Sequence, residues 1–357
     1  MEILKQNMLK IFLVLIVVFI IIILVLSIVP KQYNTVEERT LANAARNYYN
    51  DKSDLLPKDN YATSVITMEE LIQGNYIKPE KRRDGSTNTC DSYVIVVKSG
   101  DEYFYNPYIK CNDDRDTILL YDAITNNVVE DNDEGLHKIN DEYIFKGESP
   151  DNFVSFAGTT WRIVKIDEDK NIKIIYSGRT VRSFAWDDRY NLETNRNSGI
   201  NDYSVSRIYT YLQEYLYDSD NFSANNRADL ALVDLCINKR SSSDTSTDGS
   251  TECAKKLKNQ MIGLLQANEY FNASTDKNCS PNTQAVCQNY NFLASRQYWS
   301  ITATNENTWG VYRIQPSVGL DMRNARDRNN VLPVVHLRNS TVITGGTGTS
   351  ENPYVIR

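Results

Sequence analysis

The adjacent carboxyl groups of Asp187 and Asp188 are candidates for acid–base catalysis. They lie in the segment SFAWDDRYN, between Trp186 and Arg189. Two carboxyl groups flanking a glycosidic bond can cleave it, one as an acid and the other as a base or nucleophile. Adjacent residues of a strand point to opposite faces, however, so these two carboxylates would not converge on one bond. We keep glycan hydrolysis by paired carboxylates as an alternative and assign no catalytic residue.

Aromatic rings in polar surroundings could instead contribute to a ligand-binding surface. Trp186 has acidic and basic neighbours, and Trp309 follows the polar stretch NENT. Trp161 and Trp299 stand in apolar stretches and are expected in the core. The polar loops 186–197 and 241–251 are the expected binding surface. The candidate ligand-binding residues are Trp186, Asp187, Asp188, Arg189 and Trp309.

Histidine-based or metal-based chemistry has little support. The chain has two histidines, His137 and His336, and it lacks the Gly-x-Ser-x-Gly segment of many serine hydrolases. It has no Cys-x-x-Cys, and neither histidine has a cysteine nearby, so no zinc site is expected. Residues 130–141 match a calcium-binding loop only in part, with Glu130 at its first position. We therefore predict no metal and no cofactor.

The glycine-rich segment 345–349, Gly-Gly-Thr-Gly-Thr, could hold an anion on its backbone N–H groups. A phosphate-binding loop, however, opens a helix that carries a lysine, and this segment has no lysine. It leads instead into ENPYVI. We predict a structural turn that uses glycine at positive φ, closed by a strand at Tyr354–Ile356.

The charge and the N-terminal segment indicate where the protein resides. A net charge of −7 leaves no basic surface for phosphates, so nucleic acid is not expected as a partner. Residues 11–29 are apolar except for Ser27, and a helix of that length crosses about 30 Å of hydrocarbon. No small-residue cleavage site follows, which favours a single-pass anchor over a signal peptide. Because Lys5 and Lys10 precede the span, we expect residues 1–10 in the cytoplasm and the rest outside the cell membrane.

The cysteines agree with an extracellular location. All six follow the apolar segment and fall into pairs that are close in sequence. Disulfides form in oxidising compartments, and nearby cysteines are the preferred partners. The expected disulfides join Cys90 with Cys111, Cys236 with Cys253, and Cys279 with Cys287.

Three parts are expected outside the membrane. Residues 31–116 should form a small module, with a helix whose apolar stripe includes Val36 and Leu41, followed by a hairpin tied by its cysteines. A short helix capped by Thr67 and Glu70 is predicted between them. Residues 117–135 contain the run EDNDEG and are expected to be an acidic linker.

The largest part, residues 136–357, is predicted to be a mainly antiparallel α+β domain. Three short strands at 153–156, 161–166 and 172–177 suggest a meander, because turn residues separate them. Residues 206–219 have apolar side chains three or four residues apart and are predicted to form an amphipathic helix, with Ile208 and Leu212 on its apolar face. The segments QYWSITAT, WGVYRIQ and VLPVVHLRN are expected to be further strands, and MIGLLQANEYFNA a buried strand or the start of a helix.

Four motifs of this domain, in order, carry a resemblance to a known family. They are YIFKGESPDNFVSFAGTTWRIVKI, IGLLQANEYFNA, YWSITAT and LPVVHLRNSTVITGGTGTSENPYVI. They resemble a domain of unknown function in surface proteins of Gram-positive, low-GC bacteria. That domain is distantly similar to the C-type-lectin-like fold of formylglycine-generating and sulfatase-modifying factors. The sequence departs from the reactive cysteine pair of those enzymes and from the calcium-binding motifs of sugar-binding C-type lectins, so only the fold is expected to carry over.

The segment from NAARNYYND to CDSYVIVV resembles the extracellular part of pilin-like proteins. The glycine cleavage site and early glutamate of a prepilin are missing, so a static anchor is expected. Together these observations predict a membrane-anchored bacterial surface protein whose ectodomain binds a glycan or a protein without catalysis. The alternatives are a cell-envelope glycan hydrolase or modifying enzyme, and a minor pilin-like component of a surface or secretion apparatus.

Overall fold

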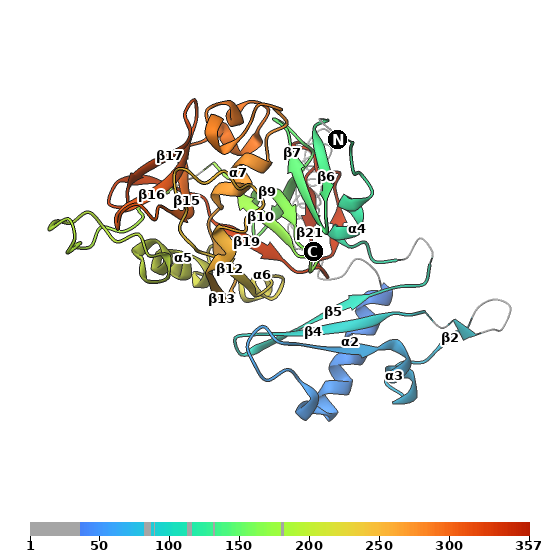
Figure 1. Ribbon diagram of the computed structural model, residues 1–357. Helices are drawn as coiled ribbons and strands as arrows, with labels where there is room; N and C mark the ends of the chain where they lie inside the picture. Colours follow the sequence, from blue (N-terminus) through green and yellow to red (C-terminus); the bar gives the residue numbers. More distant parts are fainter. Residues whose placement is uncertain (1–35, 82–86, 89, 113–115, 131–132, 180–181) are drawn as a thin grey trace, which may run out of the picture.

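The computed structural model describes residues 36–81, 87–88, 90–112, 116–130, 133–179 and 182–357. Over these ranges the chain is an α+β protein with mostly antiparallel sheets, as predicted (Figure 1). The predicted transmembrane segment, residues 11–29, lies outside them. None of the helices within them is both long enough and apolar enough to cross a bilayer.

A helix and a three-stranded sheet form the first part of the described chain. Helix α2 (Val36–Asp51) packs on the antiparallel sheet β1 (Thr63–Thr67), β4 (Tyr93–Ser99) and β5 (Glu102–Tyr108). Its predicted apolar stripe is confirmed from Leu41 onward, because Leu41, Ala44 and Tyr49 are buried against the sheet in one hydrophobic cluster, whereas Val36 at the first turn is exposed. The cluster is separate from the core of the rest of the protein.

Two local predictions in this part are also confirmed. Thr67 and Glu70 form the capping box of α3 (Met68–Gln73), and Gly74 follows its last turn. The disulfide between Cys90 and Cys111 ties the open ends of the β4–β5 hairpin. A two-residue pairing of β2 (Glu80–Lys81) with β3 (Thr87–Asn88) completes the strands of this part.

Residues 117–135, expected to be an acidic linker, contain a helix, α4 (Leu120–Thr125). Leu120 and Ile124 are buried in the larger hydrophobic core. A β-bridge joins Leu119 to Val342. The segment therefore packs on the part that follows it, and its acidic run lies only at its end.

A nine-stranded sheet is the centre of the larger part (Figure 1). Its main path runs β14 (Ile262–Gly263), β19 (Val334–Leu337), β10 (Ile172–Tyr176), β9 (Thr159–Ile166), β8 (Phe153–Phe156), β21 (Tyr354–Ile356) and β20 (Ile343–Gly345). Strands β6 (Gly135–Ile139) and β7 (Glu142–Lys146) form a hairpin that joins the sheet where β7 pairs with β9. The predicted meander is confirmed as β8, β9 and β10. All of these pairings are antiparallel except that of β21 with β8.

Helices and small sheets surround the central sheet. The helices are α5 (Arg207–Tyr217), α6 (Ala224–Ala228) and α7 (Ala267–Asn272). The small sheets are β11 (Arg182–Ala185) with β18 (Arg328–Val331), β12 (Val233–Cys236) with β13 (Lys256–Gln260), and β15 (Tyr298–Ala303), β16 (Gly310–Gln315) and β17 (Gly319–Asn324). Trp161 and Trp299 are fully buried in the shared core, as predicted.

The glycine-rich segment is a turn between β20 and β21, as predicted. Gly346 and Gly348 have φ values of +97° and +84°. A Cβ on Gly346 would lie 2.0 Å from the carbonyl oxygen of Pro353, so only glycine fits there. The carbonyl of Gly348 accepts a hydrogen bond from the backbone N–H of Phe153, which fastens the turn to β8.

Candidate functional site

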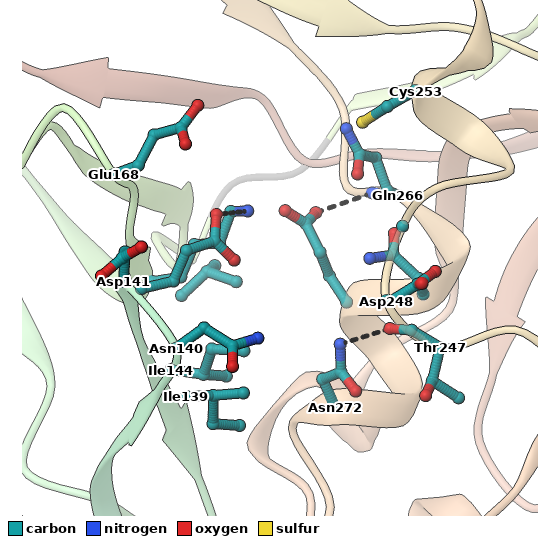
Figure 2. A pocket seen from close by; sticks show the side chains of 16 residues that line it. Ile139, Asn140, Asp141, Ile144, Glu168, Thr247, Asp248, Cys253, Gln266 and Asn272 are labelled. Atoms are coloured by element: carbon teal, nitrogen blue, oxygen red, sulfur yellow. Dashed lines mark hydrogen bonds and ion pairs between the residues drawn. The ribbon is translucent and has the colours of Figure 1, made fainter.

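A pocket of about 430 Å³, lined by both polar and apolar side chains, opens between the central sheet and helix α7 (Figure 2). One wall is the turn between β6 and β7 together with part of β9. The other wall is helix α7, from Gln266 just before it to Asn272 at its end, and the loop 247–253. Carboxylates and side-chain amides make up most of its polar lining: Asn140, Asp141, Glu142, Glu168, Asp248, Gln266, Asn268, Glu269 and Asn272.

A row of three basic side chains crosses the sheet beneath this pocket. Lys165 on β9 is the cross-strand neighbour of Lys173 on β10, and Lys173 is the neighbour of His336 on β19. Directly opposed residues of antiparallel strands share a face, so the three side chains lie on the same side of the sheet. Strands β10 and β19 are buried almost throughout, and a charge placed there requires a partner.

Two glutamates supply the partners. The ammonium group of Lys173 forms an ion pair with Glu269, and both side chains are at most 4% exposed. The second carboxylate oxygen of Glu269 accepts a 2.9 Å hydrogen bond from the backbone N–H of Gln266, within the capping box of α7. Lys165 pairs with Glu142 at 2.7 Å, nearer the pocket opening. Both glutamates belong to the lining of the pocket.

The environment shifts the pKa values of the three basic groups in different directions. Burial lowers the pKa of Lys173, and nearby Lys165 lowers it further against the opposing effect of Glu269. Burial would also lower the pKa of Lys165, but Glu269 and Glu142 outweigh it and the pKa is raised. Burial, followed by the charges of Lys173 and Lys165, holds the pKa of His336 well below its usual value. The histidine is therefore a neutral ring at physiological pH.

The opposite wall is held in place by local contacts. The side chain of Asn272 donates a 2.8 Å hydrogen bond to the carbonyl of Thr247. Arg240, which is 2% exposed, donates to Glu252 and to the carbonyls of Asp244 and Ser246. The disulfide between Cys236 and Cys253 closes the base of the same loop. These contacts fix the loop residues that face the pocket.

One buried polar atom in the pocket lining has no partner. Asn268 is 5% exposed, and its Oδ1 accepts no hydrogen bond from the protein. The amide packs against Gly249, where an added Cβ would lie 2.8 Å from its nitrogen. A buried acceptor without a donor costs about 1–3 kcal/mol, which a bound ligand or water can recover.

A second cavity, of about 350 Å³, adjoins the first. The two cavities share Thr247 and Asn272 in their linings, so the hydrogen bond between these residues lies where they meet. The second cavity is also lined by His137, Lys146, Asp276 and Lys277. Together the two cavities form a groove along α7 and its neighbouring loop.

The predicted ligand-binding residues lie elsewhere. Trp186 is fully buried in the core, and its ring N–H donates to the carbonyl of Ser300. Asp187 is also fully buried and accepts hydrogen bonds from Arg189, from the backbone of Ile200 and from the backbone of Arg207. This carboxylate organises the loop that follows it.

The other predicted residues are nearer the surface. Asp188 is exposed and pairs with Arg207 at 2.8 Å, and Arg189 is half-buried beside Asp187. Trp309 is half-buried just before β16. None of the five lines the pocket beside α7, whereas the predicted polar loop 241–251 does contribute to it through Thr247, Asp248 and Gly249. Neither Asp187 nor Asp188 lines this pocket, so the two carboxylates do not converge in it.

Sequence reasoning missed the pocket, although one signal was present. Lys173 interrupts the apolar strand IKIIY, and His336 interrupts VVHL. A charged or polar residue in a strand that is apolar on both faces indicates a buried polar cluster. The partner glutamate comes from residue 269, which only the tertiary fold brings near.

The pocket does not have the ligand set of a metal site. In the ranges that the structure describes, no group of three or more histidine, cysteine, aspartate or glutamate side chains is placed to hold a metal ion. The lining of the pocket offers amide and carboxylate groups beside apolar side chains. Comparisons of the chain with protein-family models, with curated proteins and with solved structures find no match.

Proposed function

We propose that this chain is a membrane-anchored bacterial surface protein whose ectodomain binds a glycan, without catalysis, in the groove beside α7. The proposal joins the apolar segment 11–29, the expected pilin-like first part and the expected C-type-lectin-like larger domain. Three disulfides support an oxidising environment outside the cell: Cys90–Cys111, Cys236–Cys253 and Cys279–Cys287.

The observation that carries the proposal is the amide and carboxylate lining of the pocket. Asn268 presents a buried acceptor without a donor, and Gln266 and Asn272 lie beside it in the same wall. Hydroxyl groups of a sugar can donate to such acceptors and accept from amide N–H groups. Among the described residues that line the pocket there is no aromatic ring, so recognition there rests on hydrogen bonds.

The ion pairs of Glu142 and Glu269 favour binding over hydrolysis at these two residues. A glycoside hydrolase needs two carboxyl groups that flank the bond to be cleaved. Glu142 and Glu269 each have a lysine as ion-pair partner, so neither is free to serve in such a pair. Assembly into a pilus-like apparatus has no comparable observation in its favour.

The test is a screen of the full chain, in detergent micelles, against an array of bacterial-envelope and host glycans, with and without calcium. We expect binding that Asn268→Ala abolishes and Trp309→Ala preserves, with both variants keeping the wild-type melting temperature within a few degrees. Binding lost only in Trp309→Ala would move the site to the loops around 186–197. If no glycan binds under either condition, the proposed function fails.

A further inference from the structure

The pocket contains more carboxylates than its lysines neutralise. Lys165 is paired with Glu142, and Lys173 with Glu269. Three further carboxylates line the same cavity: Asp141, Glu168 and Asp248. Over the described parts of the chain none of these three has an ion-pair partner within 4.0 Å, so the cavity is negative.

The three carboxylates stand on both sides of the opening. Figure 2 shows Asp141 and Glu168 on the sheet side and Asp248 on the opposite wall. All three residues are exposed, so a ligand entering the pocket passes between them. A single exposed charge contributes little to affinity, but several of one sign around a cleft attract a cation together.

The side chain of Asn268, in the opposite wall, favours a ligand that donates hydrogen bonds. Asn268 lines the pocket, and its Oδ1 is buried without a donor, so rotation of the side-chain amide brings this oxygen to a ligand. An acceptor in this state is satisfied by a ligand N–H or O–H and is repelled by a ligand oxygen without a proton. The rim therefore selects positive charge, and the amide of Asn268 adds an acceptor for a ligand N–H or O–H group.

The adjoining cavity has a different balance of charge. Among the described residues, two lysines and one carboxylate line it: Lys146, Lys277 and Asp276. A cationic group is therefore stabilised in the first cavity rather than in the second. Because the two cavities differ in charge, a ligand that lies along the groove is expected to bind in one orientation.

We propose that the acidic pocket recognises the protonated primary amine of an amino sugar within a glycan chain. The inference rests on the proposed glycan-binding function and names the ligand class of that same site. An amino sugar combines an ammonium group for the carboxylates with hydroxyl groups for the amides of Gln266 and Asn272. An acetylated sugar has the same hydroxyl groups but lacks the charge.

The test compares two tetrasaccharides that differ only in this group, one of glucosamine and one of N-acetylglucosamine. Binding to the full chain in detergent micelles is measured by calorimetry at about pH 6, where an ordinary amine is protonated. We expect the glucosamine oligomer to bind about tenfold more tightly, with an advantage that shrinks as salt is added. The double variant Glu168→Gln/Asp248→Asn should lose most of this preference. Lys277→Gln, in the adjoining cavity, is the matched control and should keep it.

Each other outcome overturns a different statement. Equal binding of the two oligomers overturns the amine proposal and leaves glycan binding standing. Absence of binding by both, together with an empty array, removes the proposed function itself. A trilysine peptide that binds as tightly as the glucosamine oligomer would show that the pocket recognises an ammonium group on a peptide, against the proposal. The substituted residues are exposed, so the melting temperature should stay unchanged and exclude unfolding as the cause.

Discussion

The guanidinium group of Arg357 lies 2.8 Å from the carboxylate of Glu38, and both side chains are almost fully buried. Glu38 belongs to helix α2 of the first part, whereas Arg357 follows strand β21 of the central sheet. The same arginine donates to the carbonyl of Pro107, and Thr117 donates to Glu38. A buried polar contact therefore holds the helix–sheet unit against the larger domain that carries the pocket.

Arg357→Ala should destabilise the protein through this contact. The substitution removes the guanidinium group from its ion pair with Glu38 and from the carbonyl of Pro107, and removal of one member of a buried pair costs up to about 3–5 kcal/mol. Chemical unfolding of the full chain, followed by tryptophan fluorescence and circular dichroism, measures the loss. Arg326→Ala, on an exposed turn, is the control and should change stability by less than about 0.5 kcal/mol. A similar small effect for both variants would contradict the structural role of the pair.

The raised pKa of Asp229, a carboxyl group influenced by the charge of Arg357, should make the stability of the protein depend on pH. Burial raises the pKa of this carboxyl to about 7, although the charges of Arg357 and Arg338 oppose the shift. Its Oδ2 is buried without a hydrogen-bond partner. Because the folded carboxyl keeps its proton to a higher pH than the unfolded one, folding is favoured at low pH. This contribution is lost as the pH rises from about 4 through 7.

Asp229→Asn should remove that dependence. An amide imitates the protonated acid, so the variant should gain stability relative to the wild type as the pH rises, by up to about 4 kcal/mol. Unfolding free energies of both proteins at about pH 4, 6 and 8 give the difference directly. A constant difference across this range would show that the Asp229 carboxyl titrates normally in the folded protein.

Local sequence patterns predicted the elements well, because their causes are local. The apolar stripe of α2 and the Thr67–Glu70 capping box depend on residues three or four apart. Pairing of cysteines close in sequence predicted all three disulfides. The pocket could not be predicted in this way, because Glu269 meets Lys173 across 96 residues of chain. Local sequence also failed to predict the burial of Trp186. Its polar neighbours suggested exposure, but the folded chain buries the ring.

Gly346 tests the structural interpretation of the glycine-rich turn. Gly346→Ala should destabilise the protein by at least about 2 kcal/mol, because the residue has positive φ and the new Cβ would strike the carbonyl of Pro353. Gly345→Ala is the matched control, since Gly345 also has positive φ but no atom lies within 4 Å of its Cβ position. Thermal unfolding compares the two. Equal losses would mean that the backbone conformation alone, and not the close approach, requires glycine.

The buried pair of Lys173 and Glu269 predicts strong coupling between two substitutions. Lys173→Met leaves the Glu269 carboxylate in a site that is 4% exposed, and should cost about 3–5 kcal/mol. Glu269→Gln alone leaves the buried ammonium group of Lys173 without its carboxylate partner, and should have a similar cost. The double variant has no buried charge left, and the new amide oxygen can still accept the hydrogen bond from Gln266, so much of the stability should return. Unfolding free energies of the four proteins form a double-mutant cycle. A coupling energy below about 0.5 kcal/mol would mean that the two groups do not depend on each other, and that the floor of the pocket is held by its apolar packing alone.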